Sequence, residues 1–174
     1  MDLNQTNSAF QVSLDVPYPP VKTQSQRLDY AHAMLSNVGS RNSEMSAVSL
    51  YFYNSVVLKS EYAGFARCFH EISIVEMHHL DIFATLAAQM GLDPRLWSFN
   101  RTRPFYWTPS YNHYPRKIRQ LVENALQGEE EAIDKYKRQC DAIKDENIVE
   151  NLKRIILDEE HHREIFRSML AHLK

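Results

Sequence analysis

The chain has 174 residues, and 20 Lys and Arg against 22 Asp and Glu leave a formal net charge of −2. This balance provides neither the basic surface that nucleic acids require nor a polybasic patch for a membrane. The 4 Gly and 7 Pro exclude an all-β fold and disfavour a doubly wound α/β fold, because residues 21–93 and 116–174 contain no Pro and few turn residues. At 20.4 kDa, the composition predicts one helical domain with a full core.

The sequence predicts no membrane-spanning segment, no leader peptide and no functional pair of cysteines. No run of about 18 apolar residues exists, and the first residues lack the charged and apolar regions of a signal peptide. Cys68 and Cys140 stand alone, without a Cys-x-x-Cys metal or redox pair, and we expect both to pack in the core. These features predict a soluble, cytoplasmic protein.

The first 25 residues are expected to form an extended N-terminal arm, because the segment 16–21, Val-Pro-Tyr-Pro-Pro-Val, favours polyproline II conformation. This arm would either strap a partner subunit or form a simple tail. Residues 26–174 are expected to form the helical domain. Its first helix is predicted from Gln26 to Lys59, with a bend near Gly39.

The second helix is predicted to run from a cap at Ser60 to Met90, where Gly91 ends it. A long crossover of about residues 92–114 follows and is rich in aromatic residues. They are Trp97, Phe99, Phe105, Tyr106, Trp107, Tyr111 and Tyr114. We expect these rings to fill a groove along the helices or a subunit contact. The alternative is a lid or an access channel over a site between the helices.

The last two helices complete the predicted fold. Pro115 suits the first turn of a third helix that ends near Ile143, and Asp145 can cap a fourth helix that reaches the C-terminus. Two hairpins of long helices joined by one long connection predict an all-α four-helix bundle with ferritin-like connectivity.

Two of these helices carry a Glu and a His inside an otherwise apolar seam. In the second helix, alternating steps of three and four residues trace one buried face, which Glu76 and His79 interrupt. The other members of the seam are Phe65, Phe69, Ile72, Phe83, Leu86 and Met90. In the fourth helix, Glu159 and His162 interrupt a similar seam at the same spacing.

The first and third helices each add one Glu to the pattern. Glu44 and Glu129 are each followed seven residues later by a tyrosine, Tyr51 and Tyr136 respectively. The two Glu–Tyr pairs are 85 residues apart, and the two Glu-x-x-His motifs are 83 residues apart. This internal repeat predicts two helical hairpins related by a pseudo-two-fold axis, each with one lone Glu and one Glu-x-x-His motif.

Four carboxylates on facing helices need partners, because an unpaired buried charge costs several kcal/mol. No Lys or Arg on the seams is near enough in sequence to neutralise them. Two divalent cations would balance four negative charges, and two neutral imidazoles would complete the ligands. Oxygen and imidazole donors suit iron or manganese. The alternatives are protonated or hydrogen-bonded core residues, or surface residues if the helical registers differ.

With this pattern, the sequence resembles the ferritin-like dinuclear-metal carboxylate superfamily, in its rubrerythrin and bacterioferritin branch, over roughly residues 26–173. The positions that match the family's metal ligands are Glu44, Glu76, His79, Glu129, Glu159 and His162. The resemblance implies that Glu76 and Glu159 bridge or face both metals. The lone Glu and the His of each hairpin would then flank one metal. Tyr51 and Tyr136 match tyrosines that lie beside the family's ligands.

The chain also departs from this family. It has no C-terminal rubredoxin-type cysteine module, so its electron donor is unknown, and no short fifth helix like that of cage-forming ferritins. Ala132 replaces the extra carboxylate that rubrerythrins place one turn after the third-helix ligand. Met77 resembles the haem-ligating Met of bacterioferritin, but its position next to Glu76 points away from the seam. We therefore expect Met77 to pack at an interface and do not expect haem.

Two further histidines adjoin the predicted ligands. His78 and His161 lie about 100° round the helix from them and are expected next to the site or at the surface. Asp158 and His161 offer an alternative register for the fourth helix, but the match to the second helix favours Glu159 and His162.

The leading functional prediction is a redox enzyme whose di-iron or di-manganese centre acts on peroxide or O2, as a peroxidase, catalase or ferroxidase does. Tyr51 and Tyr136 would hydrogen-bond the ligand carboxylates or supply electrons. The alternatives are iron storage or detoxification in a hollow oligomer, a structural metal-binding protein, and oxygenation of an organic substrate. We also expect a homo-oligomer, with no nucleic-acid or membrane partner.

Overall fold

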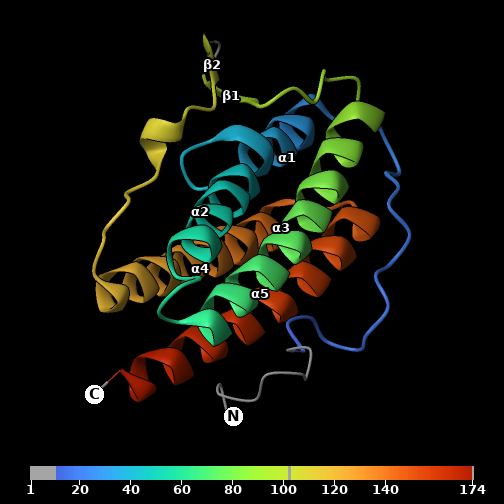
Figure 1. The fold of residues 1–174 in the computed structure, drawn as a ribbon. Helices are drawn as coiled ribbons and strands as arrows, with labels where there is room; N and C mark the ends of the chain where they lie inside the picture. The colour runs from blue at the N-terminus through green and yellow to red at the C-terminus, as the bar shows by residue number, and fades with distance from the viewer. Residues whose placement is uncertain (1–10, 102, 174) are drawn as a thin grey trace.

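The computed structural model describes residues 11–101 and 103–173 and shows a bundle of long helices (Figure 1). Within these residues the elements are α1 (Leu28–Gly39), α2 (Glu44–Val57), α3 (Ala63–Gln89), β1 (Trp97–Asn100), β2 (Arg103–Tyr106), the short 3-10 helix η1 (Pro109–Tyr111), α4 (Ile118–Ala142) and α5 (Glu146–His172). Of the expected N-terminal arm, residues 1–10 lie outside the described part. Residues 11–27 contain no helix or strand.

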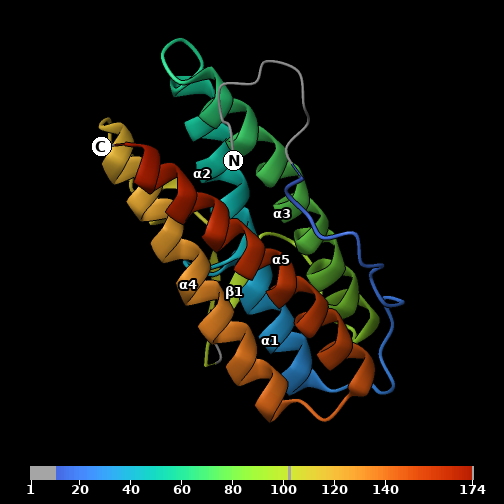
Figure 2. The same cartoon turned by 90° about the horizontal axis from the view of Figure 1, so that it is seen from below.

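Helices α1 and α2 both pack against α3, and α4 packs against α5 (Figures 1 and 2). The short connections α2–α3 and α4–α5 make each of these pairs a hairpin, and the long segment between α3 and α4 joins the hairpins. The predicted four-helix bundle of two helical hairpins joined by a long crossover is confirmed. The first of its four helices is divided into α1 and α2.

This division corrects the prediction of one bent helix over residues 26–59. The chain leaves helical conformation after Gly39, and α2 begins only at Glu44. A Cβ atom at Gly39 would lie 2.4 Å from the backbone nitrogen of Trp97, so only Gly allows the crossover to approach so closely. Lys135 of α4 then bridges the break, because its Nζ donates to the carbonyl oxygens of Ser36 at 2.8 Å and Asn42 at 2.7 Å.

Two predicted helix starts are wrong and one is confirmed. Ser60 does not cap α3, which begins at Ala63 after one further turn. Pro115 precedes α4 instead of lying in its first turn. Asp145 caps α5 as predicted, and its Oδ1 accepts from the backbone nitrogen atoms of Asn147 and Ile148.

The crossover covers the outside of α1 and α2. Strands β1 and β2 form an antiparallel pair in which Trp97 faces Tyr106. The Phe99 ring lies 4.6 Å from the His32 ring of α1, and Trp107 Nε1 donates to Ser46 Oγ of α2 at 3.0 Å. The small sheet is an addition to the predicted fold, and its aromatic side chains attach the crossover to the first hairpin.

The interior contains two apolar clusters with a polar layer between them. In one cluster the Phe69 and Phe166 rings stack at 5.2 Å, and in the other the Phe83 and Tyr136 rings lie 5.3 Å apart. Between them lie buried polar side chains, which include Glu76, His79, Glu129, Glu159 and His162. The clusters close the polar layer from both ends of the bundle.

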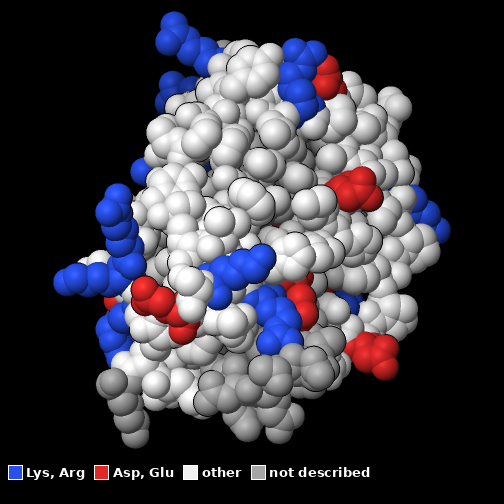
Figure 3. Space-filling model, viewed as in Figure 1, with Lys and Arg blue, Asp and Glu red and all other residues white. Residues whose placement is uncertain are grey.

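Among the described residues, no helix is both long and apolar enough to span a bilayer. On the face in Figure 3, Lys and Arg are scattered and interspersed with Asp and Glu, without a continuous basic patch. Cys68 is buried as expected, and Cys140 is partly buried.

Candidate metal centre

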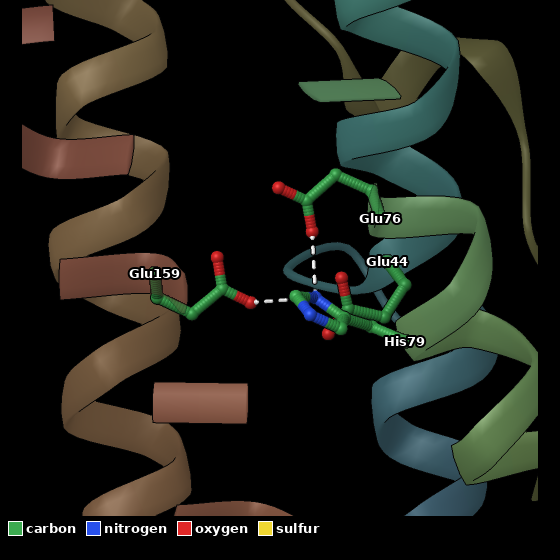
Figure 4. A group of neighbouring side chains, drawn as sticks. All are labelled: Glu44, Glu76, His79 and Glu159. Atoms are coloured by element: carbon green, nitrogen blue, oxygen red, sulfur yellow. Dashed lines mark hydrogen bonds and ion pairs between the residues drawn. The ribbon is translucent and has the colours of Figure 1, made fainter. Parts of the chain in front are cut away.

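The polar layer brings together the six side chains that the sequence pattern singles out. They are Glu44 from α2, Glu76 and His79 from α3, Glu129 from α4, and Glu159 and His162 from α5. Each is at most 2% exposed. Figure 4 shows four of them pointing toward one another from facing helices.

These side chains form two overlapping groups of four. The first contains Glu44, Glu76, His79 and Glu159, and the second contains Glu76, Glu129, Glu159 and His162. Within each group, one potential ligand atom from every residue lies within 4.8 Å of the others. Glu76 and Glu159 belong to both groups, so the layer offers two adjacent positions that share two carboxylates.

Both imidazoles direct Nδ1 toward the shared carboxylates. His79 Nδ1 lies 3.1 Å from Glu76 Oε2 and 3.2 Å from Glu159 Oε1 (Figure 4). His162 Nδ1 lies 2.9 Å from Glu76 Oε1 and 3.4 Å from Glu159 Oε2. In these contacts, oxygen and nitrogen donors that suit metal ions converge from the two helices α3 and α5.

The donor set fits divalent metal ions, because some of its buried polar atoms make no hydrogen bond. Within the described residues, Glu76 Oε1, both carboxylate oxygens of Glu159 and His162 Nδ1 are buried and make no hydrogen bond of acceptable geometry. A buried carboxylate oxygen without a donor is costly. Two divalent ions at the two positions would satisfy these atoms and balance the four carboxylates.

The outer nitrogen of each imidazole contacts residues that the sequence pattern did not single out as partners. His79 Nε2 lies 3.1 Å from Tyr18 Oη and 3.3 Å from Asp158 Oδ2. His162 Nε2 lies 2.8 Å from the carbonyl oxygen of Val12. A hydrogen on Nε2 leaves the Nδ1 lone pair facing the cluster, which is the tautomer that a metal ligand needs.

The two predicted tyrosines bond across the bundle. Tyr51 of α2 donates from Oη to Glu129 Oε1 of α4 at 2.5 Å, and Tyr136 of α4 donates to Glu44 Oε1 of α2. Both tyrosines are buried. Each hairpin thus orients the lone Glu of the other, and each tyrosine holds a proton next to the cluster.

A pocket of about 410 Å³ reaches the carboxylates between α2 and α4. Glu44, Glu129 and Gly128 are among its lining residues, as are Tyr111, Asn112 and His113 of the crossover. Asn112 Nδ2 donates to the carbonyl oxygen of Ser46 at 3.1 Å, which attaches this part of the crossover to α2. The crossover therefore borders a route from the surface to the cluster.

The rubrerythrin family profile matches residues 39–170, which include all six side chains. The chain belongs to the rubrerythrin family. No curated protein sequence matches it.

Solved structures share the fold of this rubrerythrin-family chain. KatB, a manganese catalase from Anabaena, superposes with a TM-score of 0.79 at 21% identity, over 92% of this chain and 79% of that one. Mycobacterium tuberculosis bacterioferritin BfrA gives 0.66 at 20% identity, over 85% and 87%. Rhodobacter capsulatus bacterioferritin gives 0.62 at 23% identity, over 83% and 82%.

Residues next to the cluster face elsewhere in this rubrerythrin-family bundle. His78 is exposed, and its ring meets the Tyr18 ring edge-on at 4.5 Å. His161 Nε2 lies 2.7 Å from the carbonyl oxygen of Gln11. The alternative register with Asp158 and His161 is not what the structure shows, because Asp158 contacts the outer side of the cluster. Met77 is 54% exposed on the outer face of α3.

Without metal, protons balance the charges of the cluster. Burial and the neighbouring Glu159 and Glu76 charges raise the pKa of Glu44 well above its ordinary value. The same causes raise the pKa of Glu129. Burial lowers the pKa of His162, but Glu76 and Glu159 outweigh it and raise this pKa to about 9. These shifts favour protonated carboxyl groups on Glu44 and Glu129 and a protonated imidazole on His162.

Proposed function

We propose that the cluster binds two iron or manganese ions and that the chain is an oxidoreductase acting on peroxide or O2. The observation that carries this proposal is the pair of four-residue groups that share Glu76 and Glu159 beside a pocket. The fold shared with a manganese catalase supports peroxide as the substrate. The bound metals would supply the electrons by cycling between divalent and trivalent states.

The chain's own residues would bind the metals, hold protons and exclude water. Glu76 and Glu159 would hold both metals. Tyr51 would hold a proton at Oη beside Glu129, and Tyr136 would do so beside Glu44. The apolar clusters shield the layer at both ends of the bundle, which lowers the effective dielectric around these polar contacts.

The pocket between α2 and α4 would admit the substrate. Polar groups border it, and they include Arg41, Asn42, His113, Asn124 and Gln127. They suit a small polar molecule such as hydrogen peroxide. We propose that the crossover residues Tyr111, Asn112 and His113 form one wall of this access route.

The test is metal analysis after loading the chain with Fe(II) or Mn(II), followed by peroxide and O2 consumption assays on each form. We expect about two metals per chain, as the two four-residue groups imply, and turnover with at least one metal. Only trace metal after loading, or full loading without any consumption, would contradict the proposal.

A second candidate is iron storage or detoxification, because the fold is also shared with two bacterioferritins. Storage requires a large hollow homo-oligomer, whereas peroxide chemistry works in a dimer. Size-exclusion chromatography with light scattering separates the two. A cage that accumulates iron far beyond two ions per chain would favour storage, and a small homo-oligomer would favour the enzyme with an external electron donor.

A further inference from the structure

Residues 11–27, here called the arm, run along one side of the bundle past α3 and α5 (Figure 2). The arm lies outside the repeated hairpins that supply the six clustered side chains. Even so, it is the arm that reaches the outer nitrogen atoms of both histidines. The arm thus adds contacts to both histidines from outside the repeated hairpins.

Arg154 of α5 holds the arm in place. Although only 4% exposed, this side chain donates from Nε to the carbonyl oxygen of Val16 at 2.8 Å and from Nη2 to that of Leu14 at 3.0 Å. Its guanidinium also lies 4.1 Å from the centre of the Tyr18 ring. Asp158, an ion-pair partner of Arg154, accepts from the backbone nitrogen of Leu14 at 3.0 Å. Together these buried polar contacts fix the arm to α5.

From this site the arm completes the surroundings of both imidazoles. Tyr18 donates to Asp158 Oδ2, so its oxygen is free to accept from His79 Nε2, which lies 3.1 Å away. Val12 is buried, and its carbonyl oxygen lies 2.8 Å from His162 Nε2. An imidazole whose Nε2–H is held in this way keeps both its ring orientation and the tautomer with a free Nδ1.

We propose that Tyr18 is a positioning residue for the metal centre and that arm docking and metal binding are thermodynamically coupled. The inference rests on the proposed function, because it requires that His79 and His162 bind metal. A docked arm raises metal affinity by presenting both Nδ1 atoms. By reciprocity, bound metal strengthens arm docking by the same factor.

The first experiment replaces Tyr18 by Phe in the full chain. Tyr18→Phe keeps the ring over Arg154 and removes the hydroxyl that contacts His79 Nε2 and Asp158 Oδ2. We expect metal affinity, measured by chelator competition, to fall roughly 10–100-fold, as for other outer partners of metal-binding histidines. Tyr30→Phe is the matched control, because the Tyr30 hydroxyl only accepts from the backbone nitrogen of Lys144 at the surface. Wild-type affinity in Tyr18→Phe would overturn the positioning role.

The second experiment needs no variant and measures backbone amide hydrogen exchange with and without metal. The reporter is the Leu14 amide, which bonds Asp158 and touches none of the six clustered side chains. We expect exchange across residues 11–20 to slow on metal binding, while the β1–β2 hairpin is unchanged. Equal exchange in both states, with two metals bound, would overturn the coupling and leave the metal centre intact. A chain that binds no metal would overturn both proposals.

Discussion

The two hairpins carry the same pattern of one lone Glu and one Glu-x-x-His motif but hold these side chains in different ways. In the second hairpin, Glu129 lies in the middle of the unbroken helix α4. In the first, Glu44 lies in the first turn of α2, directly after the break. The outer partners also differ. His79 Nε2 contacts the side chains of Tyr18 and Asp158, whereas His162 Nε2 contacts the backbone carbonyl oxygen of Val12. The repeat is thus symmetric in its ligands and asymmetric in their support.

Removal of a carboxylate that both positions share should have the largest effect, because both positions should lose their metal. Glu76→Ala or Glu159→Ala takes a ligand from both positions at once, so we expect metal stoichiometry to fall from two to near zero. Inductively coupled plasma analysis of Fe-loaded and Mn-loaded protein measures this. Glu130→Ala is the control, because Glu130 pairs with Arg167 on the exposed face of α4. If two metals remain in either variant, the ligand assignment is wrong.

Removal of a lone Glu should empty one metal position and leave the other occupied. Glu44→Ala leaves the position of Glu129 and His162 complete, and Glu129→Ala leaves that of Glu44 and His79 complete, so we expect one metal per chain in each. Because the break in the first hairpin makes Glu44 the less restrained ligand, we expect the remaining metal to bind more tightly in Glu44→Ala. Calorimetric metal titration compares the two affinities. A loss of both metals in each variant would show that the positions fill only together.

Both halves should respond to pH in the same direction. The neighbouring carboxylates raise the pKa of His162 to about 9, and burial together with those charges raises the pKa of Glu44 and of Glu129 above its ordinary value. Metal must displace the protons that these groups hold, so metal affinity should fall as pH decreases from about 9. Titration in weak buffer should show proton release. The metal-free fold responds oppositely, because the His162 contribution to stability is complete below pH 6.5 and lost as pH rises through about 9. Binding without proton release would contradict the protonation pattern.

Substitutions at Gly128 of α4 test whether substrate enters through the pocket between α2 and α4. The nearest atom to a Cβ built there is Tyr51 Oη at 4.0 Å, so Gly128→Ala fits and should stabilise α4 by about 1 kcal/mol through helix propensity. A Leu side chain would project into the pocket. We expect Gly128→Leu to keep its metals but to slow peroxide consumption roughly tenfold, which corresponds to an increase of about 1.4 kcal/mol in the activation free energy. The binding of azide, a small anion that serves as a probe of access to the metals, should slow by the same factor. Unchanged azide kinetics would place the route elsewhere.

The smallest effect concerns the break in the first hairpin. Lys135→Ala leaves the carbonyl oxygens of Ser36 and Asn42 without their donor, so the free energy of unfolding should decrease by about 1–3 kcal/mol. Lys137→Ala is the matched control on the same helix, because its exposed pair with Glu160 contributes at most about 1 kcal/mol. Denaturant unfolding measures both. Equal losses would show that Lys135 does not support the break.

Sequence periodicity was sufficient to predict which face of a helix is buried. The spacing of Phe69, Glu76, His79 and Phe83 predicts one buried face of α3, and the structure buries all four. That these clustered residues bind metal stays a prediction. The break after Gly39 was harder to predict, because it accompanies a close contact with the backbone of Trp97. The two segments lie about 60 residues apart in the sequence.

No periodic pattern in the sequence predicts the contacts of the arm. Arg154 and Asp158 are spaced i,i+4 on α5, which is equally typical of an exposed ion pair, yet both are buried under the arm. Tyr18 lies 140 residues from Asp158 in a segment without regular structure, so its partner could not be read from spacing. Only a tertiary fold brings these three residues together.

The crossed arrangement of ligands also constrains the order of folding. The group around His79 borrows Glu159 from the second hairpin, and the group around His162 borrows Glu76 from the first. Neither hairpin alone can therefore build a complete metal position, and the crossover must close before either position exists. If the cluster binds metal as proposed, the ions would join two hairpins that have already formed. They would not assist folding while the second hairpin is still being synthesised.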